Sequence, residues 1–114
     1  MTINSRQKGA RGEREWAQYL TEQGFKAHRG VQYQGSPDSP DVVCSQLDAY
    51  HFEVKRREAG NPYVWLKQAV NESGGKVPVV AHRRNGEAWM VIMRAEDLLK
   101  ILVHNPVANP PAPN

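Results

Sequence analysis

The sequence lacks features that disulfide-bonded, zinc-stabilised, membrane-spanning and secreted proteins require. Cys44 is the one cysteine among 114 residues, which excludes an internal disulfide and argues against a structural zinc site. No apolar run is long enough to span a bilayer, and the opening MTINSRQKGARGERE lacks the apolar segment of a secretory signal. These absences predict a cytoplasmic protein with no membrane partner.

Composition favours one small globular domain. Hydrophobic residues make up 39% of the chain, which is enough for one core, and 114 residues are too few for two ordinary domains. The final NPVANPPAPN holds too much proline for a helix or a strand. We therefore predict a single domain over residues 1–103 and a Pro-rich, disordered tail over residues 104–114.

Hydrophobic periodicity predicts the element order αβββαββα. The first helix carries an apolar stripe that includes Trp16 and Leu20, and the second begins at Asn61-Pro62, a favourable helix start. The predicted helices cover residues 6–23, 62–74 and 95–103, and the predicted strands cover residues 25–29, 41–45, 50–56, 76–82 and 87–94. This order indicates the α/β (α+β) class, with a mixed central β-sheet flanked by helices.

Two neighbouring strands, residues 41–45 and 50–56, are expected to form a hairpin. Alternation along the second strand places His51, Glu53 and Lys55 on one face. Asp41 can share a cation with Glu53 only if both side chains project from the same face of that hairpin. Because the side-chain period is two, this requires an odd-length loop or a bulge between the strands.

Hydrolysis of a phosphodiester requires carboxylates that hold a hard cation, an activated water and positive charge beside the phosphate. Three features meet these needs: Asp41 after Pro40, the pair Glu53 and Lys55, and Glu13 within the first apolar stripe. Burying an unpaired carboxylate costs on the order of several kcal/mol, so Glu13 is expected to have a partner or a metal. Glu15, on the opposite side of that helix, is expected to face solvent.

Each feature also has an ordinary structural interpretation. A Pro-Asp pair leaving a loop is common turn chemistry, which accounts for Asp41. Glu53 and Lys55 fit the solvated face of an amphipathic hairpin, and Glu13 fits the edge of the stripe, paired with a nearby Arg. A lone histidine such as His51 is more often a satisfied strand residue than a ligand.

Three segments carry a family resemblance: KGARGERE, SPDVV and HFEVKRR. Together they resemble the archaeal-type Holliday junction resolvases of the PD-(D/E)XK nuclease superfamily, over a span from about Lys8 to Leu99. The resemblance implies a restriction endonuclease-like core, Mg²⁺ as cofactor with Mn²⁺ as a substitute, a homodimer, and cleavage of branched DNA. It also implies that the family's motif residues fall on Glu13, Asp41, Glu53 and Lys55.

These observations lead to an expected set of site residues. A cation would be held by Asp41, Glu53 and the carbonyl of Val54, with Glu13 extending the site through water. Lys55 would orient the attacking water, and Gln68 would assist it, although Gln68 also fits a surface position on an amphipathic helix.

A track of basic residues is expected beside this site. The net charge of +3 favours a polyanionic partner because Lys and Arg release counterions from phosphates, although charge alone does not identify nucleic acid. The candidate DNA-binding residues are Arg6, Lys8, Arg11, Arg14, Arg29, Arg56 and Arg57.

The chain also departs from the family pattern. Residues 30–40 form a long loop containing Asp38, which could replace Asp41 as a ligand, and the region after Lys55 is short for a resolvase dimer surface. Three alternatives remain open at this point. They are a nuclease for flaps, single strands or replication intermediates, a non-catalytic DNA-binding module, and a small interaction protein.

Overall fold

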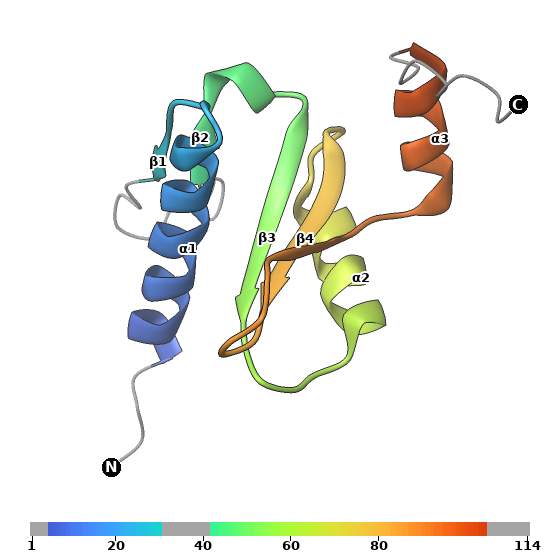
Figure 1. Ribbon diagram of the computed structural model, residues 1–114. Coiled ribbons are helices and arrows are strands. Elements are labelled where there is room, and N and C mark those ends of the chain that lie inside the picture. Colours follow the sequence, from blue (N-terminus) through green and yellow to red (C-terminus); the bar gives the residue numbers. More distant parts are fainter. Residues whose placement is uncertain (1–4, 31–41, 105–114) are drawn as a thin grey trace, which may run out of the picture.

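The structure is a computed structural model in which residues 5–30 and 42–104 are described, with side chains from Ala10 onward in the first range. The helices are α1 (Ser5–Glu22), α2 (Pro62–Glu72) and α3 (Ala95–His104), with a short 3-10 helix, η1 (Ser45–Leu47). The strands are β1 (Ala27–Arg29), β2 (Val42–Cys44), β3 (Tyr50–Arg56), β4 (Val77–Arg83) and β5 (Met90–Ile92). The predicted order αβββαββα is confirmed, with η1 inserted before β3 (Figure 1).

Local chemistry accounts for the start of α2. The Asn61 side chain accepts a hydrogen bond from the Tyr63 backbone N–H at 2.9 Å, which satisfies one of the free donors of the first turn. Pro62 follows as the first helical residue, where its missing N–H costs nothing. The helix start predicted at Asn61-Pro62 is therefore confirmed.

The strands form two separate sheets. In the three-stranded sheet β4 is central, parallel to β3 and antiparallel to β5. The antiparallel pairing expected around the Asn85-Gly86 turn is present, but β5 is only Met90–Ile92, shorter than the predicted 87–94. β1 and β2 form a two-stranded antiparallel sheet in which Arg29 pairs with Val42.

The hairpin expected between residues 41–45 and 50–56 is wrong. β2 pairs with β1, and β3 pairs with β4. Between them the chain turns through η1, where the Gln46 side chain accepts a hydrogen bond from the Lys26 backbone N–H at 2.7 Å. This contact ties the turn to the β1 side, so β2 is directed away from β3.

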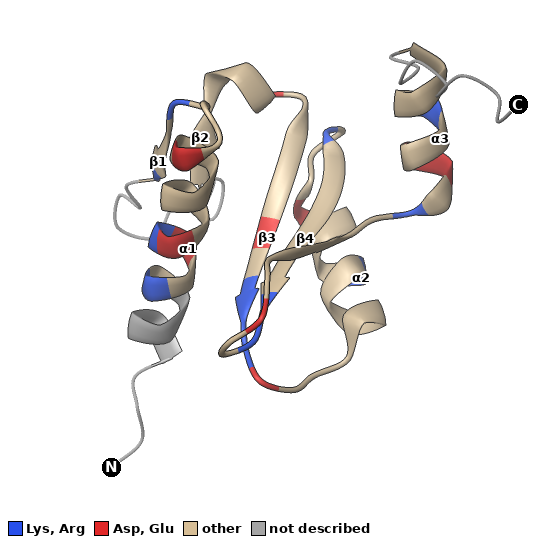
Figure 2. Ribbon diagram, in the orientation of Figure 1, with Lys and Arg blue, Asp and Glu red and all other residues tan. Residues whose placement is uncertain are grey.

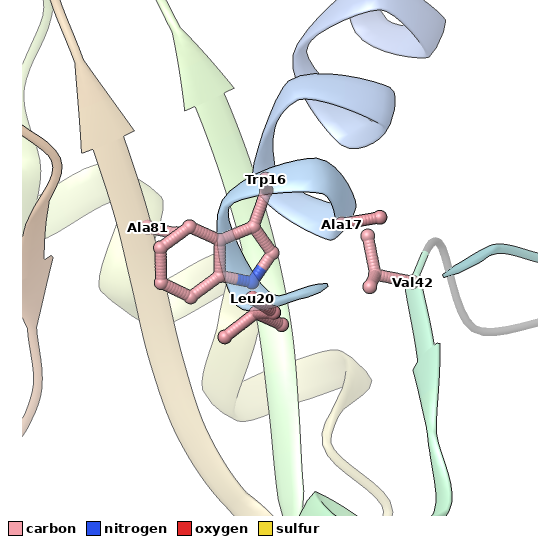
Figure 3. Close-up of a cluster of buried hydrophobic side chains, with 5 residues drawn as sticks. All are labelled: Trp16, Ala17, Leu20, Val42 and Ala81. Atoms are coloured by element: carbon pink, nitrogen blue, oxygen red, sulfur yellow. The ribbon is translucent and has the colours of Figure 1, made fainter. Parts of the chain in front are cut away.

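Helices α1 and α2 cover opposite faces of the three-stranded sheet. On one face Trp16, Ala17 and Leu20 of α1 are buried with Ala81 of β4 and Val42 of β2 (Figure 3). On the other face the buried residues are Trp65 and Ala69 of α2, with Val80 of β4. Ala81 and Val80 are consecutive, so alternation along β4 sends one side chain into each cluster.

Helix α3 stands apart from the sheet at the far end of the fold (Figure 1). Large apolar side chains of β5 and α3 are exposed, namely Met90, Val91, Leu98, Leu99, Leu102 and Val103. Arg94 anchors the helix start through a 2.7 Å ion pair with the buried Asp97. The helix includes His104, and the rest of the predicted tail lies outside the described residues.

Candidate active site

Glu53 lies in the middle of β3 on the face that α2 covers. The residue is only 5% exposed. Its Oε1 is 3.4 Å from the Lys55 ammonium, and its Oε2 is 3.9 Å from Nε2 of His51. The prediction that His51, Glu53 and Lys55 share one face of their strand is confirmed by these contacts.

Lys55 connects β3 to α2. Its ammonium donates a hydrogen bond of 3.0 Å to Oε1 of Gln68, and the Gln68 amide in turn donates to Oε1 of Glu72 at 3.4 Å. Gln68 and Glu72 are four residues apart, so they occupy the same side of the helix. Gln68 is half-buried, and its amide joins Lys55 to a second carboxylate.

His51, Glu53 and Glu72 form a compact group. One possible ligand atom from each lies within 4.8 Å of the others. Nε2 of His51 and Oε2 of Glu53 are buried, and neither has a hydrogen-bond partner in the described part of the chain. Buried polar atoms are rarely left in this state, which marks the group as a candidate ligand site.

The two carboxylates of this group differ in acidity. Burial raises the pKa of Glu53, but its contacts with His51, Glu72 and Lys55 lower it by more, so the net shift is downward. Burial and the neighbouring Glu53 carboxylate raise the pKa of Glu72 above its ordinary value. Negative charge is therefore favoured on Glu53, and the repulsion between the two carboxylates appears as the raised pKa of Glu72.

Glu13 lies on a different side of β3. Its side chain is 14% exposed, and its Oε2 accepts a hydrogen bond of 3.1 Å from Nε of Arg29. Arg29 pairs with Val42 across the two-stranded sheet, so Glu13 is beside the start of β2. Asp41, directly before Val42, and Asp38 lie outside the described residues.

The sequence matches, over residues 4–110, the family described as "Phage putative PDDEXK endonuclease". The chain belongs to this family. A solved structure of Hjc, a Holliday junction resolvase from the hyperthermophilic archaeon Archaeoglobus fulgidus, is similar, with a TM-score of 0.53 and 27% sequence identity. The similarity covers 73% of this chain and 74% of that one. A comparison with curated proteins gives no match.

The chain thus has the restriction endonuclease-like fold that the resemblance implied, and its Glu53–Val54–Lys55 segment lies within β3. Glu53 offers a carboxylate for a cation, and Lys55 offers positive charge for a phosphate. No described helix of the endonuclease is both long enough and apolar enough to cross a membrane.

Arg56 of the endonuclease is held by other protein groups. Its side chain is 15% exposed, with Nε 2.7 Å from Oε2 of Glu15 and Nη2 donating to Oδ1 of Asn85 at 2.7 Å. The expectation that Glu15 faces solvent is wrong. Helix α1 lies so close to β3 that a Cβ on Gly12 would be 2.8 Å from Cβ of Arg56. This close packing allows the Arg56 guanidinium to reach Glu15, one turn further along α1.

The other candidate DNA-binding residues differ in their exposure and in their ion pairs. Arg14 and Arg57 are exposed, and Arg11 is 74% exposed although it pairs with Glu15 at 3.4 Å. Arg29 pairs with Glu13. Basic residues lie on α1 and at the C-terminal end of β3 (Figure 2). The side chains of Arg6 and Lys8 lie outside the described residues.

Glu72 is the residue of the candidate site that sequence reasoning missed. The available signal was its spacing of four from Gln68, which places both on one side of α2. His51 was interpreted as an ordinary strand residue, but its Nε2 is buried without a hydrogen bond in the described structure. Only the packing of α2 on β3 brings these groups together.

Proposed function

We propose that the chain is a Mg²⁺-dependent DNA endonuclease that hydrolyses phosphodiester bonds in branched DNA, in the manner of a Holliday junction resolvase. The observation that carries the proposal is the buried Glu53 carboxylate paired with Lys55 at 3.4 Å, within a chain of the PDDEXK endonuclease family. A buried carboxylate costs free energy unless its charge has a function or a partner.

The residues present fit a hard divalent cation. Oε2 of Glu53 is buried without a hydrogen bond in the described structure, so one carboxylate oxygen is left for a ligand. Glu53 and the carbonyl of Val54 would hold Mg²⁺. Asp41, whose expected hairpin with β3 does not form, and Glu13 are proposed from the sequence alone as the groups that complete the site. When bound, the cation would supply Lewis-acid charge at the phosphate and lower the pKa of a coordinated water.

Lys55 has two functions in this proposal. Its ammonium would orient the attacking water and offset the negative charge that grows on the phosphate. Gln68 is a positioning residue, because its hydrogen bond to the Lys55 ammonium limits where that charge can move. Without Gln68, Lys55 would keep, among the described residues, its contact with Glu53 alone.

Exposed basic residues of the described chain would hold the DNA backbone. Arg11, Arg14 and Arg57 are the described candidates, with Arg6 and Lys8 proposed from the sequence alone. Arg29 would serve by keeping Glu13 in place. Phosphate contacts of this kind position DNA without reading its sequence, which suits recognition of a branched shape.

We further propose that two copies pair through the exposed apolar face of β5 and α3. Exposed apolar patches mark interaction sites, and paired nicks across a junction need two active sites at a fixed spacing. Changing Leu99 and Val103, which are 60% and 75% exposed, to Lys should give a monomer in sedimentation equilibrium. The matched control Tyr63→Lys, at a 79% exposed position outside this face, should remain a dimer, and a dimeric double variant would refute the interface.

A substrate panel tests the proposed activity. Labelled four-way junction, flap and linear duplex are incubated with the protein, with Mg²⁺ or with EDTA. Symmetric nicks in the junction, in Mg²⁺ only, are expected. Faster cleavage of flaps or single strands would replace the junction assignment with another nuclease activity. Absence of cleavage on all three substrates, with DNA binding intact, would indicate a non-catalytic module.

A further inference from the structure

A second set of possible ligands meets on the α2 side of β3. It contains an imidazole from His51, and carboxylates from Glu53 of the same strand and Glu72 of α2. These residues share the face formed by β3 and α2, whereas Asp41 comes from the segment that leads into β2. Glu53 is the one member common to this group and to the Mg²⁺ site proposed above.

The centre of this group contains two buried polar atoms without hydrogen bonds. Within the described residues, Oε2 of Glu53 and Nε2 of His51 are both buried and lack a hydrogen-bond partner, and they lie 3.9 Å apart. That separation is too long for a hydrogen bond between them. Leaving buried polar atoms without hydrogen bonds destabilises the fold, so a ligand between these two would remove that penalty.

The spacing suits a single metal ion. With bonds of about 2.1 Å, three ligands on neighbouring positions of one ion lie about 3.0–3.6 Å from one another. The three atoms lie within 4.8 Å of one another, so closing around an ion needs a movement of up to about 1 Å per atom, which side-chain torsions can supply. Glu72 is exposed, which leaves a route for an ion to enter from solvent.

The donor set distinguishes between cations. Mg²⁺ prefers an all-oxygen octahedron, whereas imidazole suits transition metals that accept nitrogen. We propose that His51, Glu53 and Glu72 bind a divalent transition-metal ion, with Mn²⁺ as the experimental probe. The inference rests on the proposed function only for the catalytic use of Glu53, because the binding itself requires neither DNA nor cleavage.

Mn²⁺ binding is measured without DNA, by calorimetry and by the loss of the free-ion EPR signal. The variant Asp41→Asn disables the proposed Mg²⁺ site and should still bind one Mn²⁺. Adding His51→Gln to that variant should weaken Mn²⁺ binding by at least about ten-fold, the loss typical when metal-site support is removed. Adding Glu72→Gln should weaken it to a similar extent.

The chain offers closely matched controls. Glu22 of α1 accepts a hydrogen bond from Gln18 at 3.3 Å, the same four-residue pair that Gln68 and Glu72 form. Glu22→Gln should therefore leave Mn²⁺ affinity unchanged. His28→Gln, at an exposed strand position, is the control for His51. Far-UV circular dichroism of each variant without metal establishes that it is folded.

The outcomes separate this inference from the proposed function. Equal Mn²⁺ affinity in Asp41→Asn with and without His51→Gln would overturn the site, as would no binding by Asp41→Asn. In that case His51 and Glu53 are neighbours that hold no metal ion. Mn²⁺ binding that depends on His51 and Glu72, in a protein that cleaves no DNA, would support the site and refute the nuclease activity. Because Co²⁺ absorbs visible light, a spectrum that changes in His51→Gln would independently support nitrogen ligation.

Discussion

Replacing Arg56 by Met should destabilise the protein far more than it affects DNA binding. The guanidinium contacts Glu15 at 2.7 Å, Asn85 at 2.7 Å and the carbonyl of Arg83 at 3.4 Å, with 15% of the side chain exposed. Breaking a buried ion pair costs about 3–5 kcal/mol. Glu15 is 25% exposed and keeps its contact with Arg11, so the expected loss is about 2–3 kcal/mol.

That loss corresponds to a melting temperature about 10–15 °C lower for a domain of this size. Circular dichroism during heating and urea titration measures it. Arg57→Met is the matched control, because Arg57 is the next residue and is exposed, and its stability should stay within about 0.5 kcal/mol of wild type. If Arg56→Met were as stable as Arg57→Met and instead lost DNA affinity, Arg56 would be a DNA contact and not a residue that stabilises the fold.

Three further predictions concern the site and the α1 contact. Glu72→Gln should raise the melting temperature at neutral pH without divalent ions, because burial and the neighbouring carboxylate raise the pKa of Glu72 in the folded state. This gain in melting temperature should vanish below the ordinary glutamate pKa, where Glu72 is protonated in both the folded and the unfolded protein. An unchanged melting temperature at neutral pH would contradict this. Gln68→Ala should slow cleavage while Gln68→Glu, which keeps an acceptor for Lys55, slows it less; equal rates would exclude a positioning role. Gly12→Ala should cost about 1–3 kcal/mol in urea unfolding because its Cβ would lie 2.8 Å from that of Arg56, and an unaffected variant would show that the helix can shift.

Local sequence patterns predicted much of this fold. The helix start at Asn61-Pro62 depends on one cap and one proline, and the shared face of His51, Glu53 and Lys55 depends only on strand alternation. Each of these signals acts within a few residues. The predicted element order was therefore correct.

Pairings between distant segments could not be predicted in the same way. The hairpin of residues 41–45 with 50–56 was wrong because η1, held to Lys26 by Gln46, directs β2 toward β1. The alternation of side chains along β3 also does not determine which helix covers each face of the sheet. For that reason Glu72 was missed, and the partner of Glu15 was not foreseen.

In the proposed function, Lys55, held between Glu53 and Gln68, supplies the positive charge for phosphodiester cleavage. The most direct test measures both cleavage rate and DNA affinity of Lys55→Ala in Mg²⁺, with Lys67→Ala, an exposed lysine of α2, as the control. Removing one transition-state donor typically costs about 10²–10³ in rate, so we predict a loss of that size with DNA affinity nearly unchanged. Cleavage by Lys55→Ala at the wild-type rate would show that the reaction does not need this charge.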